Sequence, residues 1–154
     1  MGKQDSQHIE IIARGVCVMD GCLLACHTKG AANTYLPGGH IEFGESAINA
    51  LTRELGEELG MRCEIRDFLG SVEHTFVQRG DQHCEINLVF AVELPGGNPQ
   101  EAPQSREDYI DFQWMELDTL GGSNLEPSVL RNLIPTWCDV HQGPWWGSTY
   151  ADAK

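Results

Sequence analysis

The chain has 154 residues and carries 10 basic and 23 acidic side chains, which gives a formal net charge of −13. This balance excludes a nucleic-acid backbone or an anionic membrane as the main partner, since both require basic surface. A small anionic substrate is compatible with it if metal ions supply positive charge locally. The length suits one domain, so we expect a single domain over residues 1–154 with flexible ends at 1–8 and 147–154.

The cysteines and the N-terminus indicate the compartment. The first residues form no apolar leader, and no apolar run reaches the roughly 18 residues that a membrane span requires. The six cysteines lack paired Cys-x-x-Cys spacing, which favours reduced thiols over a disulfide framework. Zinc binding by Cys22, Cys26 and His27 is a weaker alternative, because no second half-site follows. We therefore expect a cytoplasmic protein.

The chain begins with a predicted hairpin. Residues 9–19 are rich in β-branched side chains and predict a strand, Asp20-Gly21 predicts a tight turn, and residues 22–26 predict the returning strand. Arg14 lies inside the first strand. It is either a surface residue with its apolar stem laid along the sheet or a contact for substrate phosphate.

The segment Tyr35-Leu36-Pro37-Gly38-Gly39 leads into the central feature of the sequence. Proline fixes φ and paired glycines permit conformations closed to other residues, so the backbone can come close to a ligand here. Tyr35 and Arg14 are our candidates for substrate binding.

A helix is predicted between Ser46, whose hydroxyl can cap its start, and Gly60, which suits the left-handed turn that ends helices. One apolar arc, roughly 80° wide, is expected to pack on the core: Ile48, Leu51, Leu55 and Leu59. The neighbouring arc, about 100° wide, gathers three carboxylates: Glu54, Glu57 and Glu58.

Three carboxylates on one helical turn repel each other by a few tenths of a kcal/mol per pair. Arg53 can reach Glu57 and Arg62 can reach Glu58, both in the weaker order along the helix. A hard divalent cation such as Mg²⁺ would complete the group, since it takes carboxylate oxygens. The alternative for these residues alone is a solvated acidic helix face.

Residues 39–61 resemble the Nudix box, Gly-x5-Glu-x7-Arg-Glu-U-x-Glu-Glu-x-Gly-U, where U is aliphatic. Every defined position is matched when Met counts as U: Gly39, Glu45, Arg53, Glu54, Leu55, Glu57, Glu58, Gly60 and Met61. The resemblance implies an α/β fold of the α+β kind, a three-layer α/β/α sandwich with a mixed β-sheet. The strand and helix pattern alone predicts only a mixture of α and β.

The resemblance also implies roles for the residues of the box. In the family, carboxylates matching Glu54, Glu57 and Glu58 hold the metal together with the carbonyl group at the Gly39 position. Glu45 is expected to pair with Arg53 and so to hold the loop against the helix. From charge alone, Glu45 would simply favour the helix N-terminus.

Two strand-rich runs, 62–77 and 82–94, predict an antiparallel pair joined by a turn at 78–81. Alternation from Ile86 through Leu88 and Phe90 to Val92 predicts one buried face. His74 and His83 flank the turn. A surface or hydrogen-bonding role is favoured for them over a role in catalysis.

A Pro/Gly-rich loop at 95–105 is long enough to suggest function, and residues 110–117 are expected to form the last strand. Nudix enzymes often place an extra acid in this region, as a metal ligand or catalytic base. Glu107 is our candidate, followed by Asp108 and Glu101, and solvated loop charge is the alternative.

The C-terminal part predicts a short helix at 125–134, with Pro135 close to its end and an apolar inner face: Val129, Leu130, Leu133 and Ile134. Beyond it, Trp145 and Trp146 stand next to each other. They would cover an apolar edge of the same domain, form a subunit contact in a homodimer, or provide a platform for a base, in that order.

The resemblance implies metal-dependent hydrolysis of a phosphoanhydride, with Mg²⁺ as cofactor and Mn²⁺ as substitute. The expected substrate is a nucleoside diphosphate linked to another moiety, either an ADP-ribose-like diphosphate or a (deoxy)nucleoside triphosphate, and a nucleoside monophosphate is released. The charge balance disfavours capped or triphosphorylated RNA. The alternative is a nucleotide-binding sensor that holds metal and ligand with little turnover.

Overall fold

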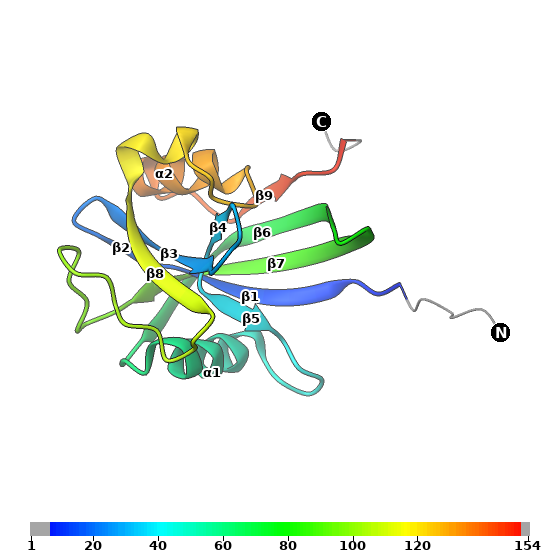
Figure 1. The fold of residues 1–154 in the computed structure, drawn as a ribbon. Coiled ribbons are helices and arrows are strands. Elements are labelled where there is room, and N and C mark those ends of the chain that lie inside the picture. The colour runs from blue at the N-terminus through cyan, green and yellow to red at the C-terminus, as the bar shows by residue number, and fades with distance from the viewer. Residues whose placement is uncertain (1–6, 152–154) are drawn as a thin grey trace.

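The computed structural model describes residues 7–151, and the expectation of flexible ends lies partly outside this range. Figure 1 shows two sheets of strands between two helices, α1 (Ala47–Leu59) on one side and α2 (Leu130–Val140) on the other. This arrangement confirms the predicted α/β/α fold. No helix among the described residues is long and apolar enough to cross a membrane.

The larger sheet has five strands, with the parallel pairs β1–β7 and β6–β9 among antiparallel ones, so it is the predicted mixed sheet. Its strands in spatial order are β5 (Gly38–His40), β1 (Glu10–Val16), β7 (Asp81–Glu93), β6 (Glu64–Gln78) and β9 (Trp145–Ser148). The antiparallel pairing of β6 with β7 confirms the predicted long hairpin.

The smaller sheet has four antiparallel strands. They are β2 (Val18–Met19), β3 (Cys22–Thr28), β4 (Thr34–Tyr35) and β8 (Ile110–Glu116). The turn between β2 and β3 has positive φ at Asp20 (49°) and Gly21 (76°), as a two-residue hairpin turn requires. A 3-10 helix, η1 (Leu117–Gly122), follows β8.

Strand β7 is buried on both faces, where alternation predicted one. Phe90 and Val92 pack in the apolar cluster under α1, and Val89 packs in the cluster under α2. The prediction of a single buried face was wrong because β7 lies at the centre of the sheet and each face is covered by a helical layer.

Helix α1 has the predicted ends. The Ser46 hydroxyl accepts a hydrogen bond from the Asn49 backbone N–H at 3.1 Å, and Gly60 ends the helix with a φ of 61°. Ile48, however, is 50% exposed, so its assignment to the core was wrong. The first turn packs on the core through the small residues Ala47 and Ala50 instead.

Helix α2 begins at Leu130 and ends at Val140, so the predicted range 125–134 was wrong at both ends. Glu126 precedes Pro127, and a residue before proline is disfavoured in the helical region, which delays the start. Pro135 lies inside the helix rather than at its end. The predicted inner face is confirmed, since Leu130 and Ile134 are buried in the core.

The strand at 110–116 is not the last one, which corrects the prediction. Residues 145–148 form β9, which pairs in parallel with β6 at the sheet edge. Trp145 packs over Gly70, where a Cβ atom would lie 2.1 Å from the Trp145 carbonyl oxygen. Trp145 therefore covers an edge of its own domain, as expected, whereas Trp146 is 59% exposed.

All six cysteines are free thiols in the structure. Burial raises the pKa of Cys17 to about 11, so this thiol stays protonated at neutral pH. The cysteines act here as small apolar residues.

Candidate active site

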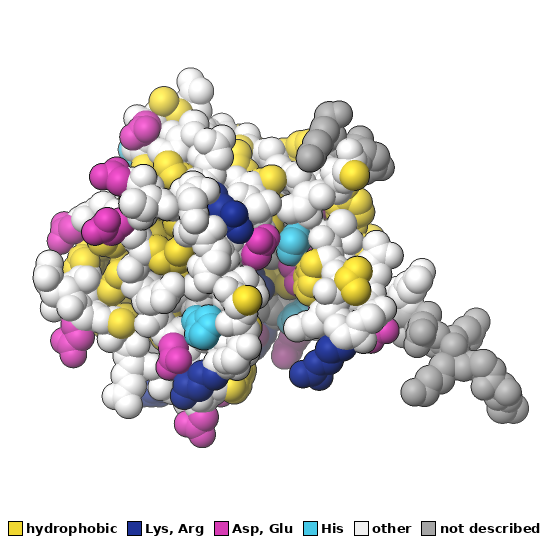
Figure 2. Space-filling view, turned by 45° about the horizontal axis from the view of Figure 1, so that its top comes forward, with side chains coloured by type: hydrophobic (Ala, Val, Ile, Leu, Met, Phe, Trp, Pro, Cys, Tyr) yellow, Lys and Arg dark blue, Asp and Glu magenta, His cyan; other side chains and the backbone are white. Residues whose placement is uncertain are grey.

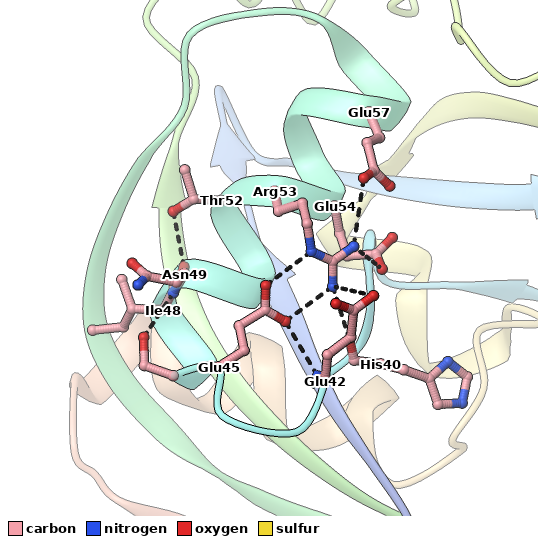
Figure 3. A network of polar contacts seen from close by, with 10 residues as sticks. His40, Glu42, Glu45, Ile48, Asn49, Thr52, Arg53, Glu54 and Glu57 are labelled. Carbon is pink, nitrogen blue, oxygen red and sulfur yellow. Dashed lines mark hydrogen bonds and ion pairs between the residues drawn. The ribbon is translucent and has the colours of Figure 1, made fainter.

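Arg53 joins the loop after β5 to the acidic face of α1 (Figure 3). Its guanidinium donates to both carboxylate oxygens of Glu45, at 2.9 and 3.0 Å, and to Glu54 Oε1 at 2.9 Å. It also donates to the carbonyl oxygen of His40 at 3.1 Å and lies 3.5 Å from Glu57. These hydrogen bonds hold the pKa of Glu45 below its ordinary value.

The carboxylate of Glu54 lies against the backbone of Gly39. A Cβ atom at position 39 would be 2.3 Å from the Glu54 carboxyl carbon, so only glycine leaves room for this contact. The structure thus brings the Gly39 backbone and the Glu54 carboxylate together. The family resemblance implies that both are metal ligands.

Glu58 is the most buried charged residue of the site, with only 6% of its surface exposed. Burial raises its pKa to about 7, and the charges of Glu54 and Glu107 act in the same direction. Arg14 and a hydrogen bond from the Gly38 backbone oppose them. One oxygen, Oε2, is buried and has no hydrogen-bond partner among residues 7–151, which is a costly state for a carboxylate.

The three carboxylates do not form a ready-made metal site. Within the described residues, no three His, Cys, Asp or Glu side chains are grouped as metal ligands. Glu54 and Glu57 pair with Arg53, while Glu58 accepts a hydrogen bond from the backbone of Gly38, the first residue of β5. Figure 3 shows the Glu54 and Glu57 carboxylates on one side of the guanidinium and Glu45 on the other.

The loop before β8 is attached to the end of α1. The Arg106 backbone N–H donates to the Glu58 carbonyl oxygen at 2.8 Å, and Glu107 is close enough to raise the pKa of Glu58. The structure therefore places Glu107 near Glu58, one of the three carboxylates of the box. Asp108 and Glu101 are exposed.

Two expectations about neighbouring residues need revision. Arg62 pairs with Glu64 and not with Glu58, because it follows the left-handed turn at Gly60 and has left the helix axis. Tyr109 was not anticipated. Burial raises the pKa of its hydroxyl, and the negative charges of Glu107 and of the three box carboxylates act in the same direction. Its position directly after Glu107 and Asp108 was the only available signal.

Arg14 lies between the acidic group and a large cavity. Its Nη1 donates to the carbonyl oxygens of Leu36 at 3.0 Å and Gly38 at 3.3 Å, and its guanidinium lies 5.4 Å from the ring centre of Tyr35. The Tyr35 hydroxyl is hydrogen-bonded to Thr28 Oγ1 at 2.9 Å. These contacts exclude a solvent-facing role for Arg14.

The cavity measures about 710 Å³, a size typical of sites for small ligands. Arg14 and Tyr35 line it, and so do His74, Glu85 and Asn87 from the larger sheet. His74 accepts or donates a hydrogen bond to Thr149 Oγ1 at 2.9 Å, and burial lowers its pKa. His74 and His83 both stack on Phe76, with ring centres 4.9 Å apart, a packing role that was not predicted. The hydrogen bond of His74 fits the favoured hydrogen-bonding role.

Comparison with known proteins identifies the family. The model of the NUDIX domain matches residues 8–136. The NAD-capped RNA hydrolase NudC of Pseudomonas aeruginosa is 28% identical over 138 residues, covering 88% of this chain and 44% of that protein. The ADP-ribose pyrophosphatase of Methanocaldococcus jannaschii is 30% identical over 78 residues, covering 50% of this chain and 45% of that protein. The chain thus spans less than half of either relative.

The solved structure of a NUDIX hydrolase from Nitrosomonas europaea superimposes with a TM-score of 0.67 at 19% identity, covering 89% of this chain and 93% of that one. The chain belongs to the Nudix hydrolase family. The recognition made from residues 39–61 is confirmed.

Proposed function

We propose that this chain hydrolyses a phosphoanhydride bond in a nucleoside diphosphate linked to another moiety and releases a nucleoside monophosphate. The main observation behind this proposal is the position of Glu58. Its carboxyl group is buried with one unpartnered oxygen, and Arg14 connects it to a cavity of about 710 Å³. A buried carboxylate beside a cavity of this size is suited to hold a cation against a phosphate.

The donor set fits a hard divalent ion, and we propose Mg²⁺, with Mn²⁺ as substitute. Glu54, Glu57, Glu58 and the Gly39 carbonyl would hold it, and all of these donors are oxygen atoms. When bound, such an ion lowers the pKa of a coordinated water and neutralises charge on the entering and leaving oxygens.

The side chains around the ion position the substrate. A guanidinium carries five N–H donors, so Arg14 can contact phosphate oxygens while its Nη1 holds the loop before β5. Arg53 fixes Glu45 and Glu54 and reduces the repulsion within the acidic face. Glu107 lies beside Glu58 on a separate loop, where its carboxylate can accept the proton of the attacking water.

The substrate is a small nucleotide, either an ADP-ribose-like diphosphate or a (deoxy)nucleoside triphosphate. The name of the Methanocaldococcus jannaschii relative supports the first type. The net charge of −13 disfavours an RNA chain, although the Pseudomonas aeruginosa relative is named for NAD-capped RNA.

A nucleotide-binding sensor is the second candidate, because Glu54 and Glu57 pair with Arg53 and do not converge on Glu58. Phosphorus NMR separates the two functions. With Mg²⁺ and a panel of ADP-ribose and nucleoside triphosphates, we expect new monophosphate resonances from the wild type and none from Glu58→Gln. Glu93→Gln, an exposed change on β7, is the control. Ligand-induced shifts in the protein without new phosphate resonances would favour the sensor.

A further inference from the structure

Polar side chains form the floor of the cavity where strands of the larger sheet lie next to each other. His74 on β6 is directly opposite Glu85 on β7, and Glu10 of β1 is in register with Glu85 on its other side. Two residues further along β7, Asn87 is 1% exposed and also lines the cavity. On the face drawn in Figure 2, acidic and histidine side chains gather around a recess near the centre.

Asn87 holds Glu85 in place. Its Nδ2 donates to Glu85 Oε2 at 3.3 Å and to the Val72 carbonyl oxygen at 3.4 Å. Its Oδ1 is buried and has no hydrogen-bond partner within residues 7–151. This oxygen is covered by protein atoms and is not reached from the cavity, so Asn87 acts on a ligand only through Glu85.

The acceptor that the floor offers to a ligand is therefore the Glu85 carboxylate, with its two oxygens. A ligand edge that matches it must present adjacent donors. Guanine does so with N1–H and its exocyclic amino group, which a carboxylate can accept as a pair. Adenine places the acceptor N1 beside its amino group, and this lone pair would face the carboxylate. Uracil has one N–H between two carbonyl groups.

The spacing along the sheet agrees with a nucleotide in this orientation. Arg14 is in register with Val89 on β7, and Glu85 is four residues away on the same strand and face. At about 3.3 Å per residue this separation is roughly 13 Å. A nucleoside can lie between a phosphate at Arg14 and a base edge at Glu85.

We propose that Glu85, positioned by Asn87, selects guanine as the base of the nucleotide that this cavity binds. The inference rests on the proposed function in that a nucleotide occupies the cavity, but it concerns the base and not the bond that is cleaved. Within both proposed substrate types it favours the guanine member, so a diphosphate substrate would carry guanine where ADP-ribose carries adenine. Glu85 is thereby a specificity-determining residue, and it lies outside the Nudix box.

Binding of the two monophosphates GMP and AMP, measured by isothermal titration calorimetry, tests the selection without any turnover. We expect the wild type to bind GMP roughly tenfold to a hundredfold more tightly than AMP, as for a bidentate contact to a base. Equal affinities, or binding of neither nucleotide, would overturn the inference.

Glu85→Gln adds a test that structural damage cannot imitate. An amide presents one donor and one acceptor, which is the pattern that adenine matches. We therefore expect this variant to lose affinity for GMP and to gain affinity for AMP. Glu93→Gln on the same strand lies outside the cavity and should keep the preference for GMP. An equal loss for both nucleotides in Glu85→Gln would contradict the assignment.

The kinetics of hydrolysis keep the two proposals apart. Selective GMP binding without turnover of any triphosphate or ADP-ribose-like diphosphate, with guanine or with adenine as base, would contradict the proposed hydrolysis and leave the base selection supported. Equal kcat/KM for dGTP and dATP together with equal binding of GMP and AMP would reject the base selection alone.

Discussion

The side chain of Arg106 packs directly on Gly60, where a Cβ atom would lie 2.0 Å from the Arg106 Nε. The Arg106 backbone also donates to the Glu58 carbonyl oxygen at 2.8 Å. These two contacts fasten the loop that carries Glu107 to the end of α1. The glycine that ends the helix thus also sets the position of the candidate base.

Gly60→Ala is expected to lower the free energy of unfolding by about 1–2 kcal/mol, because φ is 61° at this position and the new Cβ meets Arg106. Displacement of Glu107 should also lower kcat, by about tenfold. Urea denaturation and steady-state kinetics measure the two effects.

Gly56→Ala is the matched control for this substitution. It lies in the same helix, and a Cβ there meets nothing within 4 Å. Because alanine is favoured over glycine inside helices, the control should gain up to about 1 kcal/mol and keep its kcat. A similar loss of kcat in both variants would show that the Arg106 contact does not position Glu107.

Gly39→Ala is expected to reduce turnover while preserving the fold. The added Cβ would lie 2.3 Å from the Glu54 carboxyl carbon and push this carboxylate away from the β5 backbone. A displacement of about 1 Å at a reacting centre costs roughly a hundredfold in rate. Thermal denaturation and kcat at saturating Mg²⁺ are the measurements.

Gly121→Ala serves as control for Gly39→Ala, since a Cβ at position 121 meets nothing within 4 Å. It should leave both melting temperature and kcat close to wild type. Full activity of Gly39→Ala would mean that the Glu54 contact with the backbone is not needed for turnover.

Arg53→Lys is expected to lower activity although the charge is kept. Lysine is a point charge and cannot donate to both oxygens of Glu45 while it also holds Glu54 and the His40 carbonyl. We expect kcat to fall at least tenfold. Arg62→Lys, at an exposed residue that pairs with Glu64, should have wild-type kinetics, and equal kinetics in both variants would contradict the role of Arg53.

The sequence pattern was sufficient for the ends of α1, and the family resemblance for the Arg53–Glu45 pair, because these depend on residues close in the chain. Ser46, Gly60 and the Arg53–Glu45 pair all take their expected positions. Local patterns also predicted the long hairpin of β6 and β7, whose turn residues are explicit.

Features that depend on distant segments were missed. The burial of both faces of β7 requires helices from opposite ends of the chain, and β9 forms only because β6 offers a free edge. The proximity of Tyr109 and Glu107 to the box carboxylates is created by the contact of Arg106 with Gly60. None of these relations leaves a periodic signal in the sequence.

The pH dependence of stability in the metal-free protein is set in part by Glu58. Burial raises the pKa of this group from 4.5 to about 7 in the folded state, so the folded chain binds the proton more tightly than the unfolded chain does. Protonation of Glu58 contributes to the free energy of unfolding. This contribution is fully present below pH 4.5 and is lost as the pH rises through 7. The loss is on the order of 3 kcal/mol.

Glu58→Gln should therefore be more stable than wild type at pH 8 in the presence of a chelator, and equally stable near pH 4, although we expect it to be inactive. Urea denaturation at both pH values measures the difference. Glu57→Gln, at a side chain that is 51% exposed, should follow the wild-type profile. Added Mg²⁺ should remove the advantage of Glu58→Gln at pH 8, because the ion stabilises the charged carboxylate only in the wild type. An unchanged stability profile in Glu58→Gln would contradict the buried, unpaired state of this group.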